Sequence, residues 1–303
     1  MANTDTQPGS LLRRLLPRLF WILVVAVVLV YSSMGMWFVI NEQRLVLHPT
    51  RAVIPPENTP DFTYQRVDLR TKDDIRLTAW EMHCRQGDSS GIWILYLHGN
   101  AGNISDCVDR YRQLERLGVN VFAGDYRGFG ESDGHPDEEG LAKDAQAMAD
   151  YLTDVLRVPP HHIIVYGHSL GAAVAIELVS NFDAACLITE GAFTSMVDCE
   201  QASYPYLPVK LLTQYRFNSM DRVGALTLPK LFIHAVDDAS IPIAQARLLF
   251  AAAAPPKTFL TLHGGHTDCI LVDDDTFLNG VRSFLIGASL LPVSQRPVTS
   301  AGE

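Results

Sequence analysis

The residue best suited to chemistry in this chain is Ser169, which lies between Gly167 and Gly171 in the pentapeptide Gly-His-Ser-Leu-Gly. The β-branched run 163–166 before it is typical of a buried strand, and the small apolar residues 172–178 after it are typical of a packed helix. A Gly-x-Ser-x-Gly sequence between a strand and a helix forms a sharp turn that exposes the serine hydroxyl at the sheet edge. The two glycines fit this tight turn because they carry no side chain. The pattern predicts that Ser169 is a nucleophile.

A serine hydroxyl is a weak nucleophile at neutral pH, so it needs a general base and an acid that orients the base. Candidate acids follow the apolar run 231–235, which we expect to be a strand, because Asp237 and Asp238 come shortly after it. The carboxyl ends of strands are where sites form in open parallel sheets. The residues alone leave both aspartates open as the acid.

The candidate base follows a second expected strand, 258–262, which leads into His263 and His266. His263 directly follows the strand and is expected to point into the sheet or to solvent. Gly264 and Gly265 form a flexible turn that can present His266 to the serine. We therefore predict that His266 is the base, and that serine, acid and histidine occur in this order along the chain.

A negatively charged oxygen develops when serine attacks a carbonyl, and it needs backbone N–H donors. The glycine-rich stretch 98–103 follows the expected strand 92–97, so its turn can direct the N–H of Asn100 toward the serine. The second donor is the N–H of Leu170 at the start of the helix that follows Ser169. These two groups are the predicted oxyanion hole.

Strand and helix patterns alternate through residues 62–286, which predicts one α/β domain with a mostly parallel, doubly wound sheet. An antiparallel pair, 62–69 and 75–82, is expected to open the domain. The other expected elements are strands 92–97, 119–123, 163–166, 185–189, 231–235 and 258–262, with helices 104–117, 138–156, 172–178 and 274–286.

One segment, about 193–228, interrupts the alternation and is expected to be a small cap over the site. Its apolar side chains are candidates for an acyl pocket, namely Tyr204, Tyr206, Leu207 and Leu211. The alternative is an ordinary helix that packs on the core. The sequence leaves these two interpretations open.

Residues 19–40 contain no charged side chain and are long enough, as a helix, to cross a bilayer. The alternative is a cleaved signal peptide, but the run is longer than the usual apolar region of such peptides and no clear cleavage site follows. The expected result is one uncleaved transmembrane helix. Arginines 13, 14 and 18 precede it, so residues 1–18 are predicted to be cytoplasmic and the domain extracytoplasmic, periplasmic or lumenal.

The segments on either side of the domain are expected to be irregular. Residues 41–61, rich in proline from Pro49 onward, are predicted to be a linker, and 287–303 a disordered tail. A chain without residues 1–40 is therefore predicted to remain folded and active. The net charge of −10 gives no electrostatic reason to bind nucleic acid. The five cysteines and ten histidines show no metal-binding spacing, so no metal or cofactor is predicted.

These motifs together resemble the membrane-anchored α/β-hydrolase-domain proteins of the serine-peptidase-like lipase/esterase superfamily. The resemblance covers residues 62–286 and rests on segments 96–103, 125–132, 167–171, 234–242 and 264–266. The family pattern His-Gly-x-x-Asp-x-x-Val/Ile-Pro is matched at 234–242, with Ala235 in place of the glycine. This register implies that Asp238 is the acid. The resemblance also implies the α/β-hydrolase fold, but it does not choose a substrate.

The leading interpretation is a serine hydrolase that cleaves acyl ester or thioester bonds of a small-molecule or lipid substrate through an acyl-enzyme. Its predicted catalytic residues are Ser169, Asp238 and His266. One alternative is a peptidase or aminopeptidase that uses the same residues. The alternative from another class is a catalytically idle binding scaffold.

Overall fold

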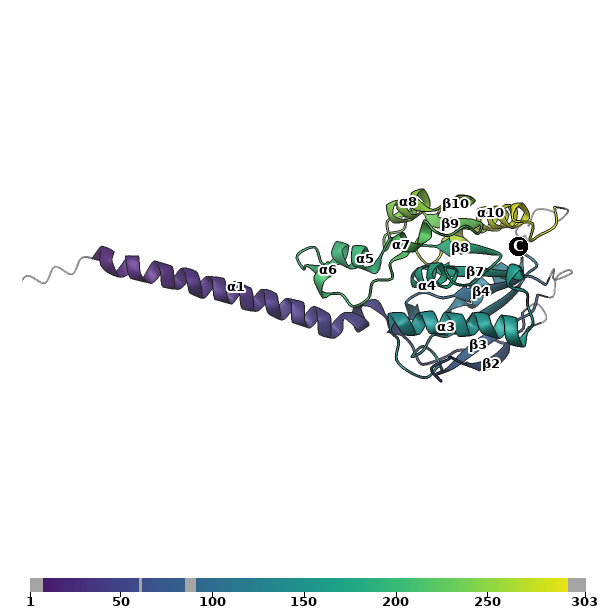
Figure 1. Cartoon of the computed structure of the whole chain (residues 1–303), viewed down its shortest axis with the longest axis horizontal. Helices are drawn as coiled ribbons and strands as arrows, with labels where there is room; N and C mark the ends of the chain where they lie inside the picture. The colour runs from purple at the N-terminus through teal and green to yellow at the C-terminus, as the bar shows by residue number, and fades with distance from the viewer. Residues whose placement is uncertain (1–7, 60–61, 85–90, 294–303) are drawn as a thin grey trace, which may run out of the picture.

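The computed structural model describes residues 8–59, 62–84 and 91–293. Its first element is helix α1 (Pro8–Val46), which projects away from the remainder of the chain (Figure 1). Its part Leu15–Val46 is long and apolar enough to cross a membrane, judged by length and composition. Most side chains of this part are exposed, as expected for a helix whose partner is lipid rather than protein.

The centre of the domain is an eight-stranded sheet with the order β10-β9-β8-β7-β4-β6-β3-β2. Strand β2 pairs antiparallel with β3, and β3 pairs antiparallel with β6, whereas the remaining neighbours are parallel. The strands are β2 (Gln65–Arg70), β3 (Arg76–Met82), β4 (Trp93–Leu97), β6 (Asn120–Gly124), β7 (Ile163–His168), β8 (Cys186–Glu190), β9 (Lys230–Ala235) and β10 (Lys257–Leu262).

Helices cover both faces of this sheet. Helices α3, α4 and α8 pack on one face, and α2 and α10 pack on the other. The helices are α2 (Val108–Glu115), α3 (Glu138–Asp150), α4 (Leu170–Leu178), α5 (Met196–Ser203), α6 (Val209–Leu212), α7 (Ser219–Val223), α8 (Ile243–Ala252), α9 (Cys269–Val272) and α10 (Asp274–Gly287). Single turns of other helix types lie at Ile104–Cys107, Tyr151–Val155 and Pro160–His162.

The central strand β4 shows why the sheet needs two helical layers. All five of its side chains are buried, and they alternate between the two cores: Leu95 and Leu97 face one layer, and Ile94 and Tyr96 face the other. A continuous apolar run is what a strand covered on both faces requires. The mostly parallel sheet with helices on both faces, predicted from the sequence, is confirmed.

The segment 193–228 contains the three short helices α5, α6 and α7 and no strand. Helices α5 and α6 lie beside the carboxyl-terminal part of α1 (Figure 1). We call residues 193–228 the cap.

The linker predicted for residues 41–61 begins later in the structure than expected. Residues 41–46 continue helix α1, because Asn-Glu-Gln-Arg-Leu-Val contains no helix breaker and the next proline after Pro17 comes at Pro49. Strand β1 (His48–Pro49) then pairs with strand β5 (Ala101–Gly102). Of the predicted linker and tail, residues 60–61 and 294–303 lie outside the described part of the chain.

Candidate active site

Ser169 lies in the sharp turn between β7 and α4, with φ 54° and ψ −118°. This left-handed backbone is strained for a residue with a side chain. The neighbouring glycines make the turn possible. A Cβ on Gly167 would lie 2.2 Å from the Gly171 carbonyl oxygen, and a Cβ on Gly171 would lie 2.0 Å from the Leu97 carbonyl oxygen. Both positions therefore exclude every residue but glycine.

Three side chains from separate loops meet at the carboxyl ends of the strands. His266 Nε2 lies 2.8 Å from Ser169 Oγ, and His266 Nδ1 lies 2.6 Å from Asp238 Oδ2. The contacts join residues 28 and 97 positions apart in the chain. A serine, an imidazole and a carboxylate in this line can transfer the hydroxyl proton to the imidazole.

The two candidate acids lie in different environments. Asp238 is buried, whereas Asp237 is exposed. The Oδ1 atom of Asp238 accepts hydrogen bonds from the N–H groups of Ser240 (2.9 Å) and Ile241 (2.8 Å), which leaves Oδ2 directed at His266. Burial raises the pKa of Asp238, but the hydrogen bonds from His266 and Ile241 outweigh it and leave the pKa below its ordinary value. The carboxylate is therefore ionised and can orient an imidazolium.

The other nearby histidines do not reach Ser169 Oγ. His263 is exposed, and its backbone N–H donates to Asp273 Oδ2 at 3.0 Å. His168 Nε2 lies 3.0 Å from the His266 carbonyl oxygen, so His168 supports the loop that carries the base. Burial lowers the pKa of His168 to about 3, which keeps the ring neutral near pH 7.

A buried ion pair, which the sequence did not predict, lies beneath the catalytic loops. Arg110 on α2 donates to both carboxylate oxygens of Glu190, at 2.8 and 2.6 Å, and also to the Thr267 carbonyl at 2.6 Å. The Glu190 carbonyl accepts the N–H of Ser169 at 2.8 Å. Burial raises the pKa of Glu190, but Arg110 outweighs it and lowers the pKa to about 2. The pair thus connects the serine turn to the histidine loop.

Gly191 is a second feature that the sequence analysis missed. It follows β8 with φ +61°, and a Cβ there would lie 2.8 Å from His266 Cε1. The imidazole therefore packs directly on the Gly191 backbone. The sequence feature that could have indicated this contact is a glycine immediately after β8, the strand that pairs with β7 before Ser169.

We expect Gly191→Ala to displace the His266 ring and to lower kcat by about 100-fold, because a shift near 1 Å at a reacting group has costs of that size. Esterase kinetics with one soluble ester measure the effect. The control is Gly287→Ala, since no atom lies within 4 Å of a Cβ at that position. A Gly191→Ala enzyme with wild-type kcat would contradict the contact.

The predicted oxyanion donors are on Leu170, which follows the serine in the chain, and on Asn100, in the loop after β4. Leu170 begins α4, and in the described chain neither its N–H nor that of Asn100 donates to a protein acceptor. Gly99, which precedes Asn100, would place a Cβ 3.6 Å from Ser169 Cβ, so the loop after β4 reaches the nucleophile. The N-terminus of α4 adds a favourable dipole for a negative oxygen. The arrangement can accept an oxyanion.

The chain that leaves α1 braces this oxyanion loop. The Asn100 side chain donates to the Val46 carbonyl at 2.7 Å, and the His48 N–H donates to the Asn100 carbonyl at 2.8 Å. Two residues later the Thr50 N–H donates to the Gly102 carbonyl at 3.0 Å. We call residues 46–52 the strap. The predicted linker is thus part of the support for the site.

The strap changes the expected effect of removing the anchor. A chain that begins at Asn41 keeps the strap, and we expect it to hydrolyse soluble esters. A chain that begins at Ile54 loses the partners of Asn100 and Gly102, and we expect its kcat to fall by about 100-fold through misplacement of the oxyanion loop. Circular dichroism of both proteins checks that each is folded. Equal activity of the two truncated chains would show that the strap has no influence on the site.

The end of α1 also holds the cap. The buried carboxylate of Glu42 accepts the N–H of Gln214 at 2.8 Å and that of Tyr215 at 3.1 Å, and the hydroxyl of Thr213 also donates to it. Glu42 therefore satisfies backbone donors where the cap chain turns back to the domain.

The predicted acyl pocket is not formed as expected. Tyr206 and Leu211 are 82% and 83% exposed, so their side chains line no enclosed space. Tyr204 and Leu207 instead pack on α1, where the Tyr204 ring meets Phe38 edge to face at a centroid distance of 5.4 Å. Of the four residues predicted to line an acyl pocket, Tyr204 and Leu207 therefore lie against helix α1.

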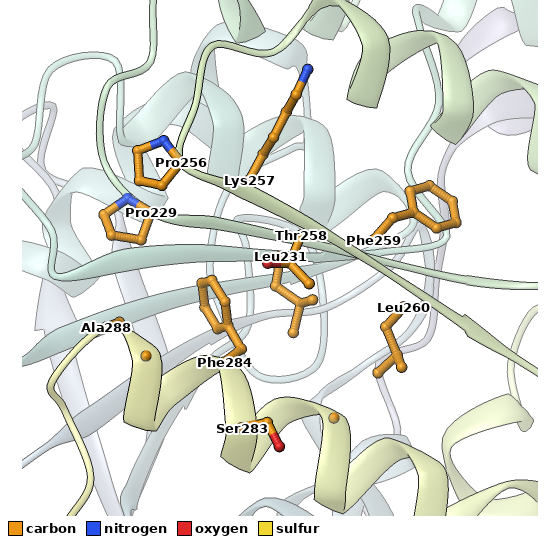
Figure 2. Close-up of a pocket in the computed structure, with 12 residues that line it drawn as sticks. Pro229, Leu231, Pro256, Lys257, Thr258, Phe259, Leu260, Ser283, Phe284 and Ala288 are labelled. Carbon is orange, nitrogen blue, oxygen red and sulfur yellow. The ribbon is translucent and has the colours of Figure 1, made fainter.

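A cavity of about 470 Å³ lies between β10 and α10, away from the catalytic residues. Figure 2 shows Phe284 of α10 beneath Pro229 and Pro256, which precede β9 and β10. These are the amino ends of the strands, whereas Ser169, Asp238 and His266 follow carboxyl ends. In the described part of the chain, no three His, Cys, Asp or Glu side chains form a group that could hold a metal ion.

A mostly parallel sheet with a serine turn after a central strand defines the α/β-hydrolase class. The family model for the alpha/beta hydrolase fold matches residues 92–216. The alpha/beta hydrolase domain-containing protein WAV2 of Arabidopsis thaliana is 32% identical over 249 residues, which span 74% of this chain and 79% of that protein. The chain belongs to the α/β-hydrolase family.

Further similarities involve a membrane protein, a lipase and an esterase. The membrane protein YNL320W of Saccharomyces cerevisiae is 32% identical over 76% of this chain and 83% of its own length. The lysophosphatidylserine lipase ABHD12 of Danio rerio is 34% identical over 59% of this chain and 51% of that protein. The esterase Pf2001 of Pyrococcus furiosus superposes with a TM-score of 0.65 at 22% identity, over 80% of this chain and 99% of its own. The last similarity supports the fold alone.

Proposed function

We propose that this protein is a membrane-anchored serine hydrolase that cleaves an acyl ester or thioester of an apolar substrate. The observation that carries the proposal is the hydrogen-bonded line from Asp238 through His266 to Ser169. A hydrolase is supported by the α/β-hydrolase fold and by the similarity to a lipase.

In the proposed first half-reaction, Ser169 Oγ attacks the carbonyl carbon of the substrate while His266 Nε2 takes the hydroxyl proton. The N–H groups of Asn100 and Leu170 bind the negative oxygen of the tetrahedral intermediate. The intermediate collapses to an acyl-enzyme, and His266 returns the proton to the departing alcohol or thiol. Asp238 keeps the ring oriented and stabilises its protonated form.

In the second half-reaction, His266 takes a proton from water, and the resulting hydroxide attacks the acyl carbon. Collapse of the second intermediate releases the carboxylic acid and returns the proton to Ser169. No cofactor takes part in the proposed cycle. The apolar substrate is supported by the lipase similarity and by the apolar surfaces of the cap and α1.

A fluorophosphonate probe, followed by a comparison of p-nitrophenyl esters with aminoacyl amides, tests this function. We expect labelling of Ser169 and faster turnover of the esters, with rates that rise from acetyl to octanoyl chains. Preference for the amides would establish a peptidase instead. An unlabelled, inactive but folded protein would make the domain a binding scaffold.

We further propose that α1 anchors the protein with its N-terminus in the cytoplasm and the hydrolase domain on the opposite side. The support is the apolar helix, the arginines at positions 13, 14 and 18 before it, and the similarity to a membrane protein. Proteolysis of sealed membrane vesicles of known orientation measures which side carries the domain.

A further inference from the structure

The cap and helix α1 form a groove whose lining includes none of Ser169, Asp238 and His266. This groove of about 510 Å³ is lined by α1 on one side and by the cap on the other. Nearly all of its surface is apolar. The lining residues are Leu29, Val30, Ser33, Met34, Trp37, Tyr204 and Leu207.

The position of this groove along α1 determines its surroundings. A bilayer core takes about 20 helical residues, and every 20-residue window within residues 19–40 contains residues 21–38. The hydroxyl of Tyr31 donates to the Tyr206 carbonyl at 2.5 Å. Because Tyr31 lies seven residues before Phe38, the cap residue Tyr206 lies about 10 Å inside the hydrocarbon edge.

The chain around Tyr206 suits such a depth. Backbone groups in hydrocarbon need internal partners. The Tyr206 carbonyl has Tyr31, the Leu207 N–H donates to the Tyr204 carbonyl at 3.0 Å, and Pro205 has no N–H to satisfy. Several backbone groups of the turn between α5 and α6 therefore have a partner within the chain or need none.

The side chains at the cap surface fit the same surroundings. Tyr206 and Leu211 expose most of their area next to an apolar helix. Together with that helix they form an exposed apolar surface of a kind that marks an interaction with a protein or a membrane. Lys210 is exposed beside Leu211, and its long apolar stem allows the ammonium group to reach lipid phosphates while the stem stays in hydrocarbon. The apolar side chains of Tyr206 and Leu211 and the ammonium group of Lys210 suit the boundary between the hydrocarbon and the phosphate groups of a leaflet.

We propose that the cap tip, residues 204–212, is inserted in the leaflet on the domain side of the membrane, and that the groove between the tip and α1 holds an acyl chain of a bilayer lipid. The inference rests on the membrane anchoring proposed above but not on the catalytic residues. The groove is continuous with the lipid-facing surface of α1, so a chain enters it without crossing water.

Quenching by lipid tests the insertion independently of activity. The full-length protein is placed in phosphatidylcholine vesicles whose acyl chains carry bromine, with an environment-sensitive fluorophore on Leu211→Cys. We expect quenching well above the background of the labelled wild-type chain. The matched control is Val155→Cys, an exposed apolar position just beyond α3, where we expect background quenching only. Tyr206→Cys repeats the test should Leu211→Cys fail to fold. Equal quenching at the cap and at Val155 would overturn the insertion.

Two further variants test the groove itself. We expect Ser33→Phe, which fills the groove, and Leu211→Asp, which carries a charge into the leaflet, to lower hydrolysis of vesicle-borne acyl lipid by about tenfold or more relative to hydrolysis of p-nitrophenyl butyrate. Val155→Asp should leave this ratio unchanged. A ratio unchanged in Ser33→Phe would overturn the acyl-chain site. A wild-type chain that hydrolyses neither the vesicle lipid nor p-nitrophenyl butyrate would instead reject the proposed hydrolase function. The quenching experiment would then decide whether the cap tip is inserted.

Discussion

Ser169→Ala is expected to abolish ester hydrolysis and probe labelling while the fold remains intact. The Ser169 hydroxyl lies 2.8 Å from His266 Nε2, and loss of a triad serine lowers kcat by up to about a millionfold in comparable enzymes. The small side chain fits the turn, since alanine carries only the Cβ that serine already has. Rates on p-nitrophenyl butyrate and the thermal unfolding midpoint measure activity and folding separately.

Ser195→Ala is the matched control for this substitution. Ser195 caps helix α5, and its hydroxyl accepts the Asp198 N–H, so it lies in the cap rather than in the serine turn. We expect a small loss of stability and nearly full turnover from Ser195→Ala. Retention of more than a few per cent of activity in Ser169→Ala would place the nucleophile elsewhere.

The second large effect is expected at Asp238. Asp238→Asn keeps the shape of the side chain but removes the charge that orients His266 and stabilises its protonated form, so we expect kcat to fall by about 10⁴-fold. Substrate binding should change little, because the carboxylate contacts the imidazole and not the substrate. Saturation kinetics at pH 7–8 separate kcat from KM.

The neighbouring aspartate provides the control. Asp237 is exposed and the carboxylate that contacts His266 is that of Asp238, so we expect Asp237→Asn to cost less than about threefold in kcat. The opposite ranking of the two variants would reassign the acid to Asp237.

Local patterns in the sequence were sufficient to predict the sheet and the loops of the site. The serine turn, the aspartate after β9 and the histidine after β10 each carry a short signal of their own, and the parallel sheet brings strand ends together. These signals predict that Ser169, His266 and one of the aspartates 237 and 238 lie at the same edge of the sheet, whereas the choice of Asp238 came from the resemblance to the hydrolase family.

The supporting contacts could not be predicted, because their signals are divided between distant segments. Arg110 and Glu190 are 80 residues apart, and each alone looks like an ordinary charged residue. Glu42 and Tyr215 are separated by 173 residues. An apolar cap residue such as Leu207 gives the same sequence signal whether its partner is the domain core or α1, so the structure was needed to identify α1 as its partner.

Helix α1 continues without interruption into the strap, and this continuity sets the distance between Ser169 and the end of the helix. The oxyanion loop is held by residues 46–50 and the cap by Glu42, so no flexible tether lies between the last turn of α1 and Ser169. With α1 anchored as proposed, Ser169 would stay at one distance from the bilayer, whereas an enzyme on a loose linker samples a range of distances. The depth of α1 in the membrane, and with it the thickness of the bilayer, would determine which ester bonds along a lipid come level with the serine.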